Sequence, residues 1–217
     1  MYTIFQITIP RLLLRVGGMV MNLKTNHQLV LASASPRRKE LFSKLGVPFE
    51  VITSDVEETS VQAKTMDHYV REVALLKARD VAKKVKDKTI IGADTVVVFE
   101  DTLLHKPKSK EEAISHLKRL SEKTHQVLTA VVILQPSGIE EVFVEETKVV
   151  FKKLSEELIE SYVETGDSFD KAGGYGIQTD GVFFVDHIIG DYNNVVGLPL
   201  ARLFEKLIAL NILTFRK

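Results

Sequence analysis

Short apolar runs alternate with segments of helical spacing along most of the chain. Apolar or β-branched runs predict buried strands at residues 28–33, 49–52 and 89–99. Two further runs, at 127–134 and 140–151, flank the turn sequence Pro136-Ser137-Gly138 and therefore predict a hairpin. The apolar residues at 181–185 predict one more strand.

Apolar residues repeat at helical spacing in the intervening segments. The predicted helices begin after Ser35, Thr65, Ser109 and Ser155, and at Pro199. Ser and Thr are good N-caps because their hydroxyl oxygens accept a hydrogen bond from a free N–H of the first turn. Since helices and strands alternate, we expect an α/β fold. The hairpin favours a mixed sheet flanked by helices over a purely parallel one.

Residues 1–27 do not fit this pattern. Their apolar stretch is broken by Pro10, Arg11 and Arg15 and is too short to span a bilayer. A secretory signal carries its positive charges before the apolar stretch, and here they follow it. We expect 1–27 to be a leader outside the fold and 28–217 to form one catalytic domain. A mis-called start, with Met19 or Met21 as the first residue, is our hypothesis for the leader, and the intact mass of the native protein tests it.

The composition excludes several classes of protein. Lys plus Arg and Asp plus Glu both number 29, so the formal net charge is zero. The chain thus has no overall attraction to nucleic acid or anionic membranes, and we expect neither as a partner. Cys is absent, which excludes disulfides and thiol nucleophiles and fits a cytoplasmic protein. Zero net charge is compatible with a homodimer without requiring one.

The segment 33–38 predicts an anion site. Arg37 and Arg38 fall in the first turn of a predicted helix, where cations oppose the helix dipole. The free N–H groups of that turn, two guanidiniums and the hydroxyls of Ser33 and Ser35 together suit a phosphate group. A surface helix with ordinary Arg residues is the alternative, but two Arg directly after a strand favour phosphate binding.

Asp94 is a carboxylate inside an apolar run. Burial of a carboxylate is costly unless the group has a partner or a function. A metal ligand and a general base on water are both open as its function. The alternative is an Asp at a strand end that faces solvent. Lys77, on an apolar helix face, and Lys106, in a loop, become candidate phosphate ligands once an anion site is present.

Two loops carry weaker signals. Asp55, Glu57 and Glu58 could supply oxygen ligands to a divalent metal, although a solvated acidic loop is the commoner outcome. The Gly-rich segment 170–178 allows close backbone approach to a ligand. There Tyr175 could stack on a base and Gln178 could bond a base edge. The chain lacks the P-loop and dinucleotide-binding motifs.

Together these segments resemble the Maf family of nucleoside triphosphate pyrophosphatases. The matching blocks, which follow the family's order over nearly the whole chain, are LASASPRR (31–38), GADTVV (92–97), KP (106–107), THQVLTAV (124–131), DKAGGYGIQ (170–178) and NVVGLPL (194–200). The resemblance implies cleavage of a nucleoside triphosphate between its α and β phosphates, with Mg²⁺ or Mn²⁺ as cofactor. It also implies two lobes around a central cleft, similar to inosine triphosphate pyrophosphatases, so that 28–217 would be one Maf-like catalytic domain.

The resemblance also assigns roles to individual residues. Asp94 matches the family's proton acceptor, and Glu58 matches one of its catalytic or metal positions. We expect Glu58 and Asp94 to hold the metal. The other catalytic or phosphate-binding positions correspond to Ser33, Arg38, Lys77 and Lys106. Arg37, Thr95 and Gln178 match positions tied to substrate choice and resemble the subfamily that acts on dTTP and UTP. The family's link to septum formation suggests an alternative, a non-catalytic nucleotide-binding regulator, beside a role in cleaning nucleotide pools.

Overall fold

The computed structural model describes residues 7–8, 21–56, 61 and 63–216. The helices of this part are α1 (Pro36–Ser43), α2 (Met66–Lys84), α3 (Lys110–Leu120), α4 (Glu156–Glu164), α5 (Tyr192–Val196) and α6 (Leu200–Ala209), with the 3-10 turns η2 (Ala172–Gly174) and η3 (Asp180–Phe184). The strands are β1 (Ile7–Thr8), β2 (Leu23–Lys24), β3 (Leu29–Ala32), β4 (Phe49–Val51), β5 (Thr89–Phe99), β6 (Thr102–Leu104), β7 (Thr124–Leu134), β8 (Glu140–Phe151), β9 (Val185–Ile189) and β10 (Thr214–Phe215).

The main sheet has eight strands and mixed direction. Its order is β1-β4-β3-β5-β7-β8-β9, and β6 pairs with the end of β5. The pairs β3–β4 and β3–β5 are parallel, whereas the pairs β5–β7, β7–β8 and β8–β9 are antiparallel. The predicted α/β class with a mixed sheet is therefore confirmed, as is the predicted hairpin, which β7 and β8 form.

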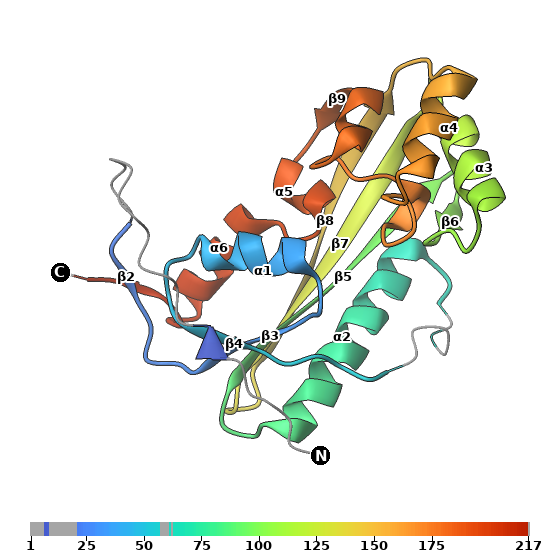
Figure 1. Ribbon diagram of the computed structural model, residues 1–217. Coiled ribbons are helices and arrows are strands. Elements are labelled where there is room, and N and C mark those ends of the chain that lie inside the picture. Colours follow the sequence, from blue (N-terminus) through green and yellow to red (C-terminus); the bar gives the residue numbers. More distant parts are fainter. Residues whose placement is uncertain (1–6, 9–20, 57–60, 62, 217) are drawn as a thin grey trace.

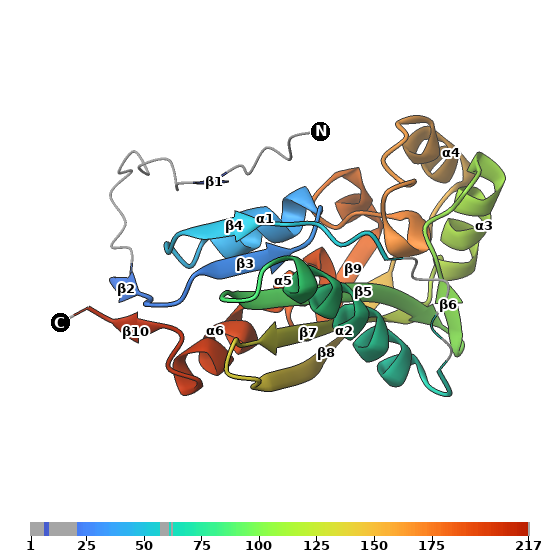
Figure 2. The same ribbon diagram turned by 90° about the horizontal axis from the view of Figure 1, so that it is seen from below.

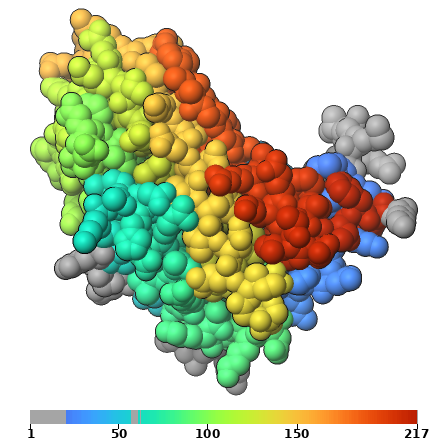
Figure 3. All heavy atoms as spheres, turned by 180° about the vertical axis from the view of Figure 1, so that it is seen from behind, coloured from blue at the N-terminus to red at the C-terminus, as the bar shows by residue number. Residues whose placement is uncertain are grey.

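The two faces of the sheet are covered differently (Figures 1 and 2). On one face α2 is the only described helix that packs on the sheet, through a cluster that includes Val30, Ile90 and Val98. Figure 3 shows the β7–β8 hairpin, in yellow, between α2, in teal and green, and α6, in red. The other face carries two separate apolar clusters, one under α1 and α6 and one under α3 and α4. These two clusters are the two lobes, and the long strands β5, β7 and β8 join them.

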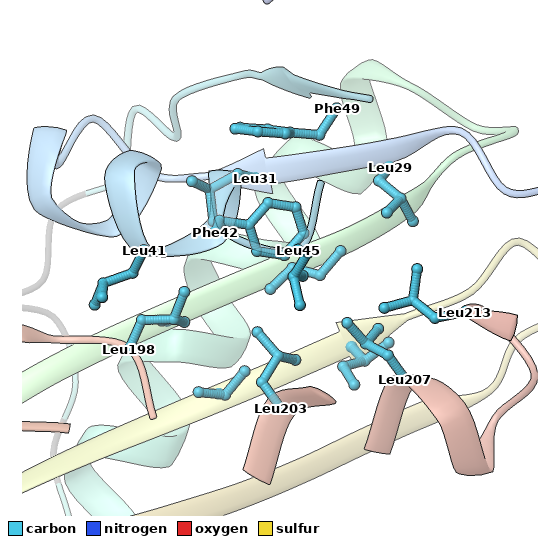
Figure 4. Close-up of a cluster of buried hydrophobic side chains, with 14 of the residues drawn as sticks. Leu29, Leu31, Leu41, Phe42, Leu45, Phe49, Leu198, Leu203, Leu207 and Leu213 are labelled. Carbon is cyan, nitrogen blue, oxygen red and sulfur yellow. The ribbon is translucent and has the colours of Figure 1, made fainter. Parts of the chain in front are cut away.

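The first lobe is built on leucine and phenylalanine side chains. Figure 4 shows Leu41 and Phe42 of α1 and Leu203 and Leu207 of α6 packed together on the same face of the sheet. Burial of such side chains contributes about 1.5–3 kcal/mol each. The helical spacing of these apolar residues is the reason that both helices present one face to the sheet.

Two sequence-based expectations need correction. The segment 181–185 is not a strand: η3 occupies most of it, and β9 begins at Val185. A Cβ atom at Gly181 would lie 2.6 Å from the Gly176 carbonyl oxygen. The backbone here therefore packs against a loop and does not pair with a neighbouring strand. The fold also begins before residue 28, because Leu23 is buried and β2 pairs with β10 near the C-terminus.

The leader contributes one short strand, since β1 pairs antiparallel with β4. Its other residues before Met21 lie outside the described part of the chain, so the hypothesis of a mis-called start stays a prediction. In the described helices, no stretch is both long and apolar enough to cross a bilayer.

Candidate active site

The start of α1 follows directly on the carboxyl end of β3. Ser35 is the N-cap, and its hydroxyl oxygen accepts a 3.4 Å hydrogen bond from the Arg38 N–H. Pro36 fits the first helical position because it has no N–H to leave unpaired. The Ser35 N–H donates to the Ser33 hydroxyl at 3.2 Å, which tightens the turn. Ligands of open α/β sheets bind outside such strand ends, and a helix start favours an anion.

Arg38 lies at this helix start with its guanidinium held by three acceptors. Its Nε donates to the Gly197 carbonyl at 2.8 Å, and its terminal nitrogens donate to the hydroxyls of Thr95, at 2.8 Å, and Ser33, at 3.4 Å. Gly197 has φ +120°, a conformation that favours glycine. The structure thus brings three predicted site residues, Ser33, Arg38 and Thr95, into one hydrogen-bonded group.

Lys77 and Asp94 form an ion pair on the opposite face of the sheet. Lys77 Nζ lies 2.7 Å from Asp94 Oδ1, and the two side chains are only 14% and 8% exposed. Gly92 makes the approach of α2 possible, since a Cβ there would lie 2.8 Å from the Ala78 Cβ. Sequence reasoning identified both charged residues but not their pairing, which depends on how α2 docks on β5.

The two groups meet at a gap in the sheet. On this side of β5, the pairing with β3 ends at Gly92 and the pairing with β6 begins at Val97. Among the described residues, no strand pairs with 93–96 on this side. Asp94 faces α2, as Val96 does, whereas Thr95 lies between Ala93 and Val97, which belong to the two lobes. A ligand at the start of α1 would therefore lie near polar side chains from both faces of the sheet.

Arg37 points to a different part of the molecule. Its guanidinium bonds the Asp170 carboxylate at 2.8 Å. Burial raises the pKa of this carboxyl, but the hydrogen bonds from Lys171 and Arg37 outweigh burial, so the pKa is lowered overall. Asp170 opens the Gly-rich segment, so this ion pair links α1 of the first lobe to the second lobe. Sequence reasoning missed Asp170, although its place beside the Gly run was a usable signal.

Lys106 and Gln178 are both exposed on the second lobe. The loop of Lys106 packs against η2, where the Gly173 N–H donates to the His105 carbonyl at 3.3 Å. Gln178 follows η2 in the same Gly-rich segment. Within the described residues, neither side chain is hydrogen-bonded to Arg38 or to Asp94. Their predicted contact with a nucleotide stays a prediction.

The interpretation of Tyr175 as a base-stacking residue is wrong. Its ring is buried in the second lobe, edge-on to Phe151, and its hydroxyl lies 2.7 Å from His125 Nε2. Burial raises the pKa of Tyr175 and lowers the pKa of His125 to about 3, so both are neutral at ordinary pH. Tyr175 therefore anchors the Gly-rich segment to the sheet and does not face a ligand.

A surface hollow of about 600 Å³ lies beside the first residues of the Gly-rich segment. Its lining contains none of the predicted site residues and consists of Thr165, Gly166, Asp167, Asp170, Lys171, Thr179 and Asp180. It touches the site only through Asp170. Because the hydrogen-bonded groups of Arg38 and Asp94 lie elsewhere, we place the site at the gap and not in this hollow.

The fit of a divalent metal rests on Asp94. Glu57 and Glu58 lie outside the described residues, and among the residues described no group of three or more acidic or His side chains could hold a metal. Mg²⁺ is commonly held by one or two carboxylates together with substrate phosphates and water. Asp94 suits such a site because its carboxylate is mostly buried and the next residue, Thr95, bonds Arg38 at the start of α1.

The fold and the geometry define an α/β protein with a mixed sheet that is interrupted beside β5, next to a helix start that suits an anion. The chain belongs to the Maf family, because residues 28–210 match the family described as Maf-like protein. A dTTP/UTP pyrophosphatase of Halalkalibacterium halodurans is 48% identical over 80% of this chain and 91% of its own length. One of Thermoanaerobacter pseudethanolicus is 50% identical over 82% of this chain and 94% of its own.

A solved structure of a HAM1 protein from Coxiella burnetii aligns with 84% of this chain and 99% of that one. The identity is 16% and the TM-score 0.48.

Proposed function

We propose that the protein hydrolyses nucleoside triphosphates, dTTP and UTP above all, to a nucleoside monophosphate and pyrophosphate. The observation that carries the proposal is the gap beside β5, where the hydrogen-bonded group of Arg38, Thr95 and Ser33 meets the Lys77–Asp94 pair. The relatives named dTTP/UTP pyrophosphatase, at 48–50% identity over most of the chain, support it.

The start of α1 binds the triphosphate. Its free N–H groups and the guanidinium of Arg38 carry positive charge toward the phosphates, with Ser33 as a further hydroxyl partner. Lys106 reaches the outer phosphates from the loop of the second lobe. Charge stabilisation and positioning of this kind supply most of the catalysis in phosphoryl transfer.

Asp94 is the proton acceptor of the proposed reaction. A water oxygen bonds to the α-phosphorus, the bond from this phosphorus to the bridging oxygen breaks, and pyrophosphate leaves. The water proton goes to Asp94. Lys77 bonds Oδ1 of Asp94 and so fixes the plane of the carboxylate, which leaves Oδ2 for the water.

The proposal includes a divalent metal, Mg²⁺ or Mn²⁺, held by Asp94 and Glu58. When bound, it neutralises phosphate charge that the basic residues leave uncompensated. Removal of metal by EDTA should abolish pyrophosphate release, and an excess of Mg²⁺ should restore it. Full activity in EDTA would remove the metal from the proposal and leave the rest intact.

Substrate choice is the proposed role of Arg37, Thr95 and Gln178. Arg37 and Gln178 border the Gly-rich segment, where the base of a nucleotide bound at α1 would lie. Thr95 bonds Arg38 directly and so connects substrate choice to the phosphate site. Loss of selectivity between dTTP and purine triphosphates in an Arg37→Ala variant would support this assignment.

The deciding experiment is a panel of nucleoside triphosphates scored by kcat/KM for pyrophosphate release, with wild type and Asp94→Asn side by side. We expect dTTP and UTP to be the best substrates and the variant to lose most turnover. Binding of these nucleotides without pyrophosphate release under Mg²⁺ would contradict the enzyme and identify a nucleotide-binding protein instead.

The proposal places the protein in the cytoplasm, where its substrates are, with neither nucleic acid nor a membrane as a partner. Zero net charge supports this placement. We also propose that the protein acts on nucleotide pools, with a homodimer as the state to test by light scattering.

A further inference from the structure

A band of buried polar side chains crosses the sheet between the two lobes. Thr129 of β7, Thr147 of β8 and Asn194 of α5 are all 0% exposed, although apolar clusters lie on either side. Burial of polar groups at this depth is costly unless their hydrogen bonds are satisfied. The band ends at Thr95, which lies opposite Thr129 in the β5–β7 ladder.

The direction of each hydrogen bond in this band follows from its last acceptor. The backbone carbonyl of Asn194 has no proton, so the Thr129 hydroxyl must donate to it, at 3.1 Å. Thr129 then accepts from the Thr95 hydroxyl, at 3.0 Å. Thr95 in turn accepts from the Arg38 guanidinium, at 2.8 Å. The result is a one-way chain from Arg38 through Thr95 and Thr129 to the Asn194 carbonyl.

The far end of the chain is held firmly. The Asn194 side-chain amide donates to the Val127 carbonyl and to the Thr147 hydroxyl, both at 3.0 Å. Thr147 donates to the Asp191 carbonyl at 3.0 Å. Asn194, whose backbone carbonyl accepts from Thr129, is therefore bonded through its side chain to β7 and β8. The carbonyl cannot turn away from Thr129 without breaking these bonds.

Thr95 has one competing acceptor. The Gly197 carbonyl lies 3.5 Å from its hydroxyl, a longer distance than the 3.0 Å to Thr129. That carbonyl already accepts from Arg38 Nε at 2.8 Å. Without the Thr129 hydroxyl, the Thr95 proton would turn to Gly197 and compete with Arg38 for the same oxygen.

We propose that Thr129 is a positioning residue for the nucleotide site. It contacts no ligand, because it is fully buried, and acts by fixing the hydroxyl of Thr95 and thereby the guanidinium of Arg38. This role rests on the proposed function, since it assumes that Arg38 binds the phosphates of a nucleotide.

The test compares Thr129→Val with its matched control Thr129→Ser. Valine keeps the shape and removes the hydroxyl, whereas serine keeps the hydroxyl. We expect Thr129→Val to lower kcat/KM for dTTP about tenfold, the size of one lost buried hydrogen bond, and Thr129→Ser to stay within about threefold of wild type. Equal losses in the two variants would overturn the proposal.

A double-mutant cycle with Thr95→Val separates positioning from a general effect on the fold. If Thr129 acts through Thr95, its substitution should change kcat/KM by less than about twofold once Thr95 is valine. Fully additive losses would overturn the proposal. Thermal melting of each variant checks folding, and Thr129→Ala, which adds no bulk, replaces Thr129→Val in the cycle if the valine variant does not fold.

The same cycle can be measured as dTTP binding by calorimetry in EDTA. If wild type binds dTTP but releases no pyrophosphate with Mg²⁺, the proposed function fails while the binding cycle still tests Thr129. If wild type is active and Thr129→Val binds dTTP as tightly and turns it over as fast as wild type, only the positioning role fails. The two failures are therefore distinguishable.

Discussion

Two buried pairs of polar side chains, each with one member on the main sheet, have the same hydrogen-bond distance but different surroundings. Lys77 and Asp94 are 2.7 Å apart beside the gap in β5, and His125 and Tyr175 are 2.7 Å apart within the second lobe. The first pair joins a basic and an acidic side chain, whereas burial keeps both members of the second pair neutral. Asp94 of the first pair is next in sequence to Thr95, which bonds Arg38 of α1, and the second pair is enclosed by aromatic rings.

The difference shows what a buried polar pair must have to be part of a site. Burial and a short hydrogen bond are common to both pairs, so neither property identifies function. Only the Lys77–Asp94 pair combines a basic and an acidic side chain and lies at the gap beside β5. Substitutions in the first pair should therefore change the rate of hydrolysis, and substitutions in the second pair should change the stability of the fold.

Asp94→Asn should have the largest effect. The amide keeps the shape of the carboxylate but cannot accept the proton of water, so we expect kcat to fall about 10³-fold. Thermal melting should show an intact fold. Pyrophosphate release from dTTP under Mg²⁺ measures the rate, and near-normal turnover in this variant would remove Asp94 from the mechanism.

Lys77→Met should have the next largest effect. It leaves the Asp94 carboxylate without the ammonium that orients it, and we expect kcat/KM to fall about 10²-fold. Lys77→Arg is the matched control because it keeps the charge, and it should recover part of the rate. If methionine and arginine at this position gave the same rate, the charge of Lys77 would not be its contribution.

Tyr175→Phe should leave the rate within about twofold of wild type and lower the free energy of unfolding by about 1–2 kcal/mol, because the His125 ring loses its partner. Urea unfolding and dTTP hydrolysis measure the two quantities on the same preparation. A large loss of kcat with unchanged stability would place Tyr175 at the ligand and reverse the comparison between the two pairs.

The last effect concerns pH and acts on stability, not on the rate. The pKa of His125 is about 3 in the folded protein, below its usual 6.5. Between pH 6.5 and 3 the unfolded chain therefore binds a proton that the folded chain does not, so the free energy of unfolding decreases as the pH falls through this window.

His125→Gln keeps a hydrogen-bonding group for Tyr175 and removes the titration. From pH 7 to pH 4.5, wild type should lose about 2 kcal/mol more stability than this variant. Parallel urea titrations at the two pH values measure the difference. Identical losses in both proteins would show that His125 is not kept neutral by the fold.

The sequence predicted local structure better than it predicted contacts. Residues 89–99 were expected as a strand and form β5, and Ser35 was expected to cap α1 and does so. Both predictions depend on residues that are near each other along the chain. The Lys77–Asp94 pair depends on the docking of α2 against Gly92, which no local pattern contains.

The wrong and missing predictions have the same cause. Tyr175 lies in a Gly-rich segment that suggested an open loop, but tertiary packing places its ring among Phe151 and His125. Thr129 is a polar residue in an apolar run, the same signal that singled out Asp94, yet its partner Asn194 lies 65 residues further on. Such partners become visible only in the folded chain.

The gap in β5 has a consequence for how this kind of enzyme can diversify. Neighbouring residues of one strand face opposite sides, so that Asp94 meets α2 while Thr95 meets α1 and α5. In the proposed mechanism, substitutions at Thr95 act through Arg38, which bonds the Thr95 hydroxyl, and not through the carboxylate of Asp94. The hold on the nucleotide can therefore change in the course of evolution while the Lys77–Asp94 pair is kept.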